Sequence, residues 1–431
     1  MMELKRVENK RIGEVCYTGI HSSGLKICLY PKEGYVSAYA LFSTRYGSVD
    51  TRFKRSDEDE YIKVPAGIAH FLEHKLFESE DGDAFARYAE TGASANAFTS
   101  FDQTGYLFSC SENFGKAFEI LLDFVQKPYF TEQTVEKEQG IIGQEIKMYD
   151  DSPPWRVFFN LLDGLYHSHP VRIDIAGTVE SIAKIDADLL YRCYHTFYNL
   201  HNMALTVVGK FDRDEVEALC DRFLKPAEDV RVDSVFSEEP EEIRQRRVEQ
   251  RFPIAVPLFN IGFKEFCGRE PKTPARLAAT EILLEAVTGN HTPLYRNLLE
   301  QGLINATFGS EYFNGPGYAA VILGGESANP DEVYRQVCGA IEQLKKEGLD
   351  RDSFARSKKA VYARRVAEFN SIETIAQNAV ESMFDGYSIY DIMEATAACG
   401  YEEANARLRE QMDPRRSVLS LVLPTEERKV E

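Results

Sequence analysis

The feature that most limits how this chain can fold is the charged stretch from Pro226 to Gln250. It reads PAEDVRVDSVFSEEPEEIRQRRVEQ, has few residues suited to a core, and keeps neither a helical nor a strand period. Strand-like and helical patterns alternate on both sides of it. A chain of 431 residues, 44% of them hydrophobic, can fill two cores of ordinary domain size. We therefore predict two domains, 1–225 and 248–431, joined by a linker over 226–247.

The two halves share a weak internal echo. Near the end of the first half, a helical pattern (LLYRCYHTFYNL) leads into the strand pattern ALTVVG. Near the end of the second half, EEANARLREQM leads in the same way into SVLSLVLP. The echo suggests a duplicated α+β unit, with chance similarity of two helix–strand joins as the alternative.

Charge and composition exclude several classes of protein. The net charge of −19 argues against a nucleic-acid partner, because phosphate binding needs clustered Lys and Arg. No apolar run is long enough to span a membrane, and the charged start MMELKRVENKRIGEV has no apolar signal core. The eight cysteines form no Cys-x-x-Cys pair. Scattered cysteines of this kind indicate reduced thiols, so we expect a cytoplasmic protein.

The stretch HFLEHKLFES, residues 70–79, places two histidines four positions apart with a glutamate between them. Its pattern predicts a helix, with Pro65 in the first turn. Positions i, i+3 and i+4 share a helix face, so His70, Glu73 and His74 point the same way. Two imidazoles one turn apart can both reach one zinc ion at about 2.0–2.1 Å. The competing interpretation is an ordinary inner helix face, since the motif supplies two ligands and a catalytic zinc needs three.

A third ligand is offered by a second predicted helix, TEQTVEKEQGIIGQEIKMYDD, which Thr131 can cap. Glu138 and Glu145 fall on one face of this helix, and either carboxylate could complete the site. A solvated acidic face is the competing interpretation. Gly140 and Gly143 lie inside the helix at a cost of roughly 1 kcal/mol each relative to Ala. From that cost we expect this helix to approach another element closely.

His70-x-x-Glu73-His74 followed by Glu138 and Glu145 resembles the inverted zinc motif of the insulinase/pitrilysin/mitochondrial-processing-peptidase family, the inverzincins. The resemblance covers nearly the whole chain and is strongest for the roughly 430-residue bacterial two-domain members. It implies an α+β fold of two homologous domains, each a mostly antiparallel sheet packed with helices. It also implies a zinc metalloendopeptidase.

The resemblance assigns roles to individual residues. His70, His74 and Glu145 would bind Zn²⁺, and Glu73 would be the general base that activates water for attack on a peptide carbonyl. Glu138 would orient the ligands from behind.

The stretch GASANAFTS, residues 92–100, resembles the family's active-site edge strand. Asn96, Ala97 and Phe98 would then bind the main chain of a peptide substrate by strand addition. The competing interpretation is a plain strand of small residues.

The second half departs from the family pattern. Catalytic members carry an Arg and a Tyr there that help to hold the substrate carbonyl. This chain has Leu298 or Leu299 at the position of the Arg and Asn305 at that of the Tyr. Arg296 and Tyr312 are nearby but out of register.

The family's peptidase chamber needs four domains, and this chain has two. We therefore expect a homologous two-domain subunit to complete the chamber and to supply the missing pair. A heterodimer is favoured, and a homodimer is possible.

Two other functions remain open. The chain could be a non-catalytic peptide-binding or scaffold subunit, although the intact set of site residues argues against that. It could also be a zinc hydrolase that does not act on peptides, which the edge-strand segment disfavours.

Overall fold

A computed structural model describes residues 3–80, 82–265 and 273–425. By its contacts the chain divides into two compact units, each made of non-contiguous segments. The first unit comprises residues 1–146, 174–235 and 366–390, and the second comprises 147–173, 236–365 and 391–431. These units differ from the predicted halves by an exchange of two segments, 147–173 and 366–390.

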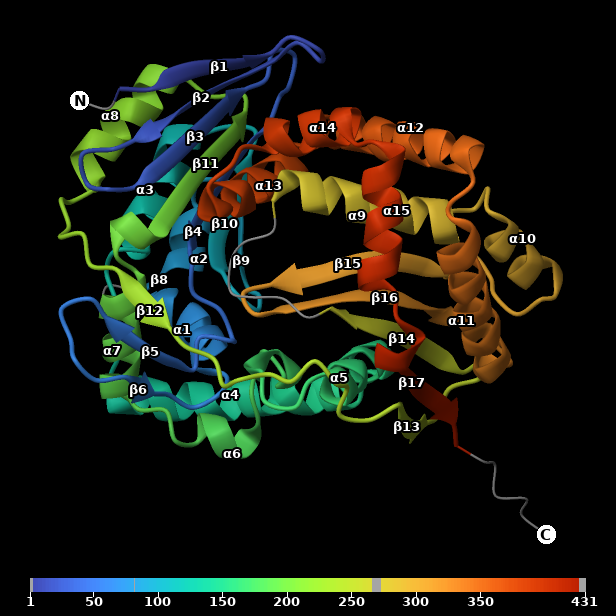
Figure 1. Ribbon diagram of the computed structural model, residues 1–431. Coiled ribbons are helices and arrows are strands. Elements are labelled where there is room, and N and C mark those ends of the chain that lie inside the picture. The colour runs from blue at the N-terminus through green and yellow to red at the C-terminus, as the bar shows by residue number, and fades with distance from the viewer. Residues whose placement is uncertain (1–2, 81, 266–272, 426–431) are drawn as a thin grey trace. The chain divides into compact units, whose positions relative to one another are not determined.

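The first unit is built on a seven-stranded sheet with the order β1-β2-β3-β11-β4-β10-β9 (Figure 1). Neighbouring strands run antiparallel except for β3 and β11, which are parallel. The strands of this sheet are β1 (Lys5–Asn9), β2 (Glu14–Ile20), β3 (Lys26–Pro31), β4 (Ala38–Thr44), β9 (Ser94–Thr99), β10 (Thr104–Cys110) and β11 (Met203–Gly209). Smaller ladders are formed by β5 (Arg52–Arg55), β6 (Ile62–Lys63) and β12 (Val232–Ser234), and by β7 (Glu78–Ser79) and β8 (Gly82–Asp83).

The first unit also contains helices, some of which pack on this sheet. They are α1 (Ile68–Leu76), α2 (Ala84–Ala89), α3 (Phe114–Phe124), α4 (Glu132–Asp150), α6 (Val179–Ile182), α7 (Ala187–Phe197), α8 (Arg213–Phe223) and α13 (Ile372–Asp385), with a 3₁₀ turn η2 (Leu200–Asn202). Every residue of β4 and β11 is buried. These two central strands are therefore covered on both faces, which explains their mainly apolar sequences.

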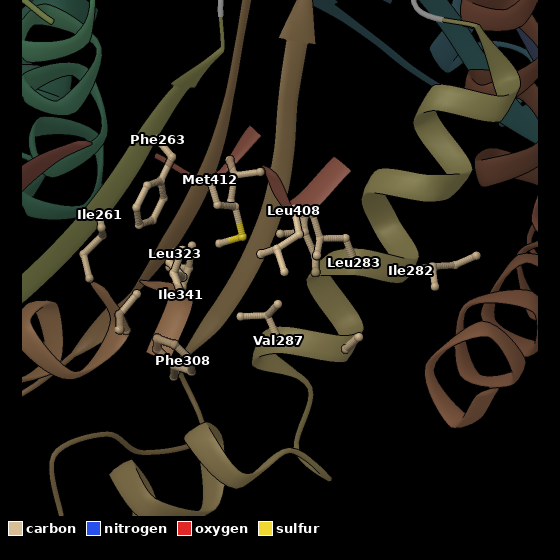
Figure 2. Close-up of a cluster of buried hydrophobic side chains, with 14 of the residues drawn as sticks. Ile261, Phe263, Ile282, Leu283, Val287, Phe308, Leu323, Ile341, Leu408 and Met412 are labelled. Carbon is tan, nitrogen blue, oxygen red and sulfur yellow. The ribbon is translucent and has the colours of Figure 1, made fainter. Parts of the chain in front are cut away.

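The second unit is built on a five-stranded sheet with the order β13-β17-β14-β16-β15. Its strands are β13 (Arg247–Phe252), β14 (Leu258–Glu265), β15 (Gly309–Gly315), β16 (Tyr318–Glu326) and β17 (Ser417–Pro424). Its helices are α5 (Pro153–Leu165), α9 (Pro274–Thr288), α10 (Pro293–Glu300), α11 (Pro330–Glu347), α12 (Arg351–Glu368), α14 (Ile389–Ala398) and α15 (Tyr401–Gln411), with 3₁₀ turns η1 (Pro170–Arg172) and η3 (Pro414–Arg416). Figure 2 shows its core, in which side chains from the sheet, such as Phe263 and Leu323, pack against Leu283 and Leu408 from helices.

Five strands of the first sheet (β3-β11-β4-β10-β9) repeat the topology of the second sheet, which confirms the predicted α+β fold of duplicated type. In each sheet a parallel pair (β3 with β11, β13 with β17) is followed by three antiparallel strands that end on an edge strand, β9 or β15. The weak sequence echo marks equivalent elements. The strands β11 and β17 occupy the same place, and a helix and a 3₁₀ turn precede each of them.

Each sheet also receives a helix from the other half of the sequence. The helix α13 packs on β11 and β4, and α5 packs on β17, β14 and β13 (Figure 1). Gly262 in β14 makes room for α5, since a Cβ there would lie 2.9–3.0 Å from the side chains of Leu165 and Leu161. The exchange thus depends on close contacts between distant segments.

None of the helices in the described ranges is long and apolar enough to cross a membrane. Of the eight cysteines, Cys267 lies outside the described residues, and the other seven carry free thiols.

Candidate metal centre

The two histidines of the site, His70 and His74, lie on α1, a short helix that is almost wholly buried. The helix is confirmed, and its apolar residues Ile68, Phe71 and Leu72 are at most 3% exposed. The expected place of Pro65 in the first turn was wrong, because the helix begins after Gly67. Gly67 has a φ of 90°, and a Cβ there would collide with the carbonyl of Ala176. A left-handed glycine therefore starts this helix.

The carboxylates of the site lie on α4, which begins where the sequence predicted. The Thr131 hydroxyl accepts a hydrogen bond from the N–H of Thr134 at 3.2 Å and so caps the first turn. Glu138 is buried and Glu145 half-buried. The expected reason for Gly140 and Gly143 was wrong, because a Cβ at either position would meet no atom within 4 Å.

The structure brings together the three predicted ligands. One donor atom from each of His70, His74 and Glu145 lies within 4.8 Å of the other two. Nε2 of His70 is 3.7 Å from Oε1 of Glu145, and Nε2 of His74 is 3.4 Å from Oε2. Ligand atoms arranged tetrahedrally at about 2.0–2.1 Å from zinc are separated by about 3.3 Å. The donor set and its spacing therefore fit one zinc ion.

Glu138 lies behind this set. Its Oε1 is 3.1 Å from Nδ1 of His74, the ring nitrogen opposite the one near Glu145. A carboxylate in this position fixes the ring and leaves Nε2 for a metal. His70 lacks such support, since its buried Nδ1 has no hydrogen-bond partner among the described residues.

The pKa values of the two imidazoles are shifted in opposite directions. Burial, with the nearby charge of His74, lowers the pKa of His70 to about 4. Burial alone would also lower the pKa of His74, but hydrogen bonds to Glu138 and Glu145 outweigh it and raise that pKa to about 10. The carboxylates of Glu138 and Glu145 bring negative charge to this largely buried site, and a divalent cation would neutralise that charge.

Glu73 lies beside the three donor residues without belonging to the set. It is 8% exposed, and burial raises the pKa of its carboxyl group. The Thr99 hydroxyl donates a hydrogen bond to its Oε2 at 2.8 Å. Sequence reasoning did not single out Thr99, because one threonine in a strand carries no distinctive signal.

The predicted substrate residues Asn96, Ala97 and Phe98 lie on β9, the last strand of its sheet. This strand pairs with β10 and with no second strand among the described residues. The N–H of Ala97 donates to Oδ1 of Asn96 at 2.9 Å, so it is directed away from β10. The ring of Phe98 occupies the space over Gly105 that a side chain there would fill. The main chain of β9 is therefore the part of this segment suited to pair with a peptide.

In the second unit, Leu298 is part of the core and Leu299 is 46% exposed. Asn305 donates to Glu326 at 2.9 Å. The hydroxyl of Tyr312 donates to Glu265 at 2.7 Å, where burial also raises the pKa of Tyr312. Tyr312 is thus engaged in a structural contact.

Comparisons with known proteins agree with this fold. Residues 57–179 match the insulinase family of peptidases, family M16, and residues 184–361 match the domain described as the M16 inactive domain. The chain is 37% identical over 433 residues to YmfH of Bacillus subtilis, called an uncharacterized zinc protease, covering 98% of this chain and 99% of that one.

Solved structures show the same relationship. A crystal structure from Alicyclobacillus acidocaldarius, described as M16-like, superposes with a TM-score of 0.91 at 34% identity and covers 98% of this chain and 99% of that one. A protease from Helicobacter pylori shares the fold, with a TM-score of 0.79 at 18% identity over 98% of this chain and 100% of that one.

The fold and these relatives place the chain in the class of zinc-protease-like proteins. This chain belongs to the insulinase family, M16.

Proposed function

We propose that this protein is a zinc-dependent endopeptidase that hydrolyses short or unfolded peptides inside a chamber completed by a second subunit. One observation carries the proposal. Three donor atoms spaced for one ion lie beside a buried carboxylate, Glu73, that is hydrogen-bonded to the edge strand β9. A metal, a base and a surface for peptide backbone are the parts that hydrolysis of a peptide bond requires.

His70, His74 and Glu145 would hold the ion, with Glu138 fixing the ring of His74. When bound, the ion supplies a Lewis acid that polarises the carbonyl and lowers the pKa of water. His₂Glu ligation also accepts manganese or cobalt, and zinc is proposed on the family relationship and the donor spacing.

Glu73 would act as the proton carrier. Its carboxylate takes a proton from the water that attacks the peptide carbonyl, and the same proton then passes to the amine nitrogen as the C–N bond breaks. Burial beside the ligands suits this role, because it raises the pKa of the carboxyl group and so strengthens the base.

The edge strand β9 would bind the substrate as an added strand. Main-chain pairing gives affinity with little dependence on side chains. The N–H of Ala97 now donates a hydrogen bond to Oδ1 of Asn96, and this bond must break before the N–H can pair with a peptide. A peptide must be extended over several residues to pair in this way, which favours short or unfolded substrates over folded proteins.

A second two-domain chain would complete the active enzyme. The exposed Leu299 and the engaged Asn305 and Tyr312 leave those positions without a cation or an available hydroxyl for the substrate carbonyl. A homologous partner without its own zinc motif could supply that pair, and a second copy of this chain could not supply it from the same positions. We therefore favour a heterodimer. The lack of a cation and an available hydroxyl at these positions also supports the alternative of a non-catalytic peptide-binding subunit.

The proposal is tested by incubating the zinc-loaded chain with a mixed library of quenched peptides, alone and with candidate homologous partners. The controls are a chelator and Glu73→Gln, which keeps the shape of the side chain and removes the base. Hydrolysis that both controls abolish supports the peptidase. Zinc binding without hydrolysis in any combination supports the peptide-binding alternative.

A further inference from the structure

The hydroxyl of Thr99 is placed where it can control the orientation of Glu73. We propose that Thr99 is a positioning residue that ties Glu73 to the strand on which the peptide lies. This inference rests on the proposed function, and it concerns a residue outside the donor set. It stands on a 2.8 Å hydrogen bond between a residue of β9 and a residue of α1.

The direction of this hydrogen bond follows from its neighbours. The hydroxyl of Thr104 lies 3.5 Å from that of Thr99, but it donates its single proton to the carbonyl of Tyr46 at 2.8 Å. An ionised carboxylate can only accept. The proton of Thr99 is therefore the one that reaches Oε2 of Glu73, and a bond to a charged acceptor is among the stronger hydrogen bonds.

The backbone around Thr99 is fixed on both sides. Thr99 pairs with Thr104 at the end of the β9–β10 ladder, and the turn closes with the N–H of Ser100 on the carbonyl of Gln103 at 2.8 Å. The carbonyl of Ser100 also accepts from the N–H of Ser48 at 3.0 Å. A β-branched side chain on such a backbone has few rotamers. The hydroxyl is thus held in place by the sheet itself.

This arrangement links substrate binding to the base. Thr99 follows the predicted peptide-binding residues on the same strand, and α1 lies against β9. The hydrogen bond holds one oxygen of Glu73 and leaves the other to move the proton. Loss of the hydroxyl should therefore misdirect Glu73 while the edge of β9 and the donor set stay as they are.

The test compares wild type, Thr99→Val, Thr99→Ser and Thr206→Val as the zinc-loaded full chain, alone and with the candidate homologous partners. Valine keeps the shape of threonine and removes the hydroxyl, and serine restores it. Thr206 lies fully buried in β11 of the same sheet, and its hydroxyl has no hydrogen-bond partner among the described residues. It is therefore the control for removing a buried hydroxyl from this sheet. Zinc content, hydrolysis kinetics and the position of the Glu73 carboxylate in crystals are measured for each variant.

We expect Thr99→Val to bind zinc and keep KM, to lose about 10- to 100-fold in kcat, and to show Glu73 turned from its wild-type position. Thr99→Ser should stay near wild type in each measurement, and Thr206→Val should match wild type. An unmoved Glu73 in Thr99→Val, or an unchanged kcat, would overturn the proposal. If no variant hydrolyses peptides alone or with any candidate partner, the peptidase proposal fails, and the position of Glu73 in the crystals still decides the role of Thr99.

Discussion

Nδ1 of His74 lies 3.1 Å from Oε1 of Glu138, while Nε2 of the same ring lies 3.4 Å from Oε2 of Glu145. The two carboxylates come from one helix and contact the two nitrogens of one imidazole. Their separation by seven positions, two turns of α4, makes this possible. One glutamate can therefore serve as a ligand and the other as the support of a ligand.

Removal of this support should weaken metal binding without abolishing it. We expect Glu138→Gln to lower zinc affinity by about 10- to 100-fold, because the amide holds the His74 ring less strongly than a carboxylate does. Competition with a chromogenic chelator measures the affinity. Glu136→Gln, on the exposed face of the same helix, is the matched control and should bind zinc like wild type. Equal affinities for wild type and Glu138→Gln would contradict this role.

Removal of a ligand should have a larger effect than removal of the support. We expect Glu145→Ala to retain far less than one zinc per chain after dialysis, because two imidazoles alone do not complete the site. Elemental analysis of the dialysed protein measures this. Gln144→Ala, one position away and exposed, should keep the wild-type zinc content. Full occupancy in Glu145→Ala would show that another residue is the third ligand.

The glycines of α4 should be replaceable with a gain in stability. Gly140→Ala and Gly143→Ala place a methyl group in open space within a helix, so each should stabilise the protein by about 0.5–1 kcal/mol. The thermal midpoint should rise by roughly 2–4 °C per kcal/mol in a scan of the metal-free chain. Gly67→Ala is the contrasting variant and should lower the midpoint, because its φ of 90° and the nearby Ala176 carbonyl forbid a side chain. A lower midpoint for the α4 variants would point to a need for glycine there.

Stability should also depend on the protonation of Asp50. Burial raises the pKa of this carboxyl group to about 6, and nearby Asp102 adds to the shift while Arg45 opposes it. The folded-state pKa lies above the unfolded value near 3.9. The folded state therefore binds the proton more tightly, and its stability falls as pH rises from about 4 to 6.

Asp50→Asn should remove this part of the pH dependence, since an amide does not ionise but can still accept from the N–H of Gly47. Urea unfolding of both proteins at pH 4.5 and 7 measures it. The variant should gain stability relative to wild type as the pH rises, and a constant difference between the two proteins would refute the assignment to Asp50.

Local spacing was enough to predict much of the site. The i, i+3, i+4 pattern gave the shared face of His70, Glu73 and His74, and the cap at Thr131 gave the start of α4. The distinction between Glu138 and Glu145 came only from the family resemblance, because it depends on where α4 lies against α1. Thr99 was missed for the same reason, since its partner lies 26 positions away.

Features that depend on long-range packing could not be predicted from the sequence. Nothing in the patterns of residues 147–173 or 366–390 shows that these segments join the other half of the chain. The prediction that Gly140 and Gly143 allow close approach of another element was wrong, because the sequence shows only that a glycine lacks a side chain. A left-handed φ or a close neighbour can require a glycine, as at Gly67, and only the fold shows whether either is present.

The proposed function depends on the metal centre, and anomalous diffraction at the zinc edge tests that centre most directly. Crystals of the chain grown with one equivalent of zinc should show a single strong anomalous peak about 2.0–2.1 Å from Nε2 of His70, Nε2 of His74 and an oxygen of Glu145. A peak bound by other residues, or no peak at this place in a protein that binds zinc in solution, would contradict the account.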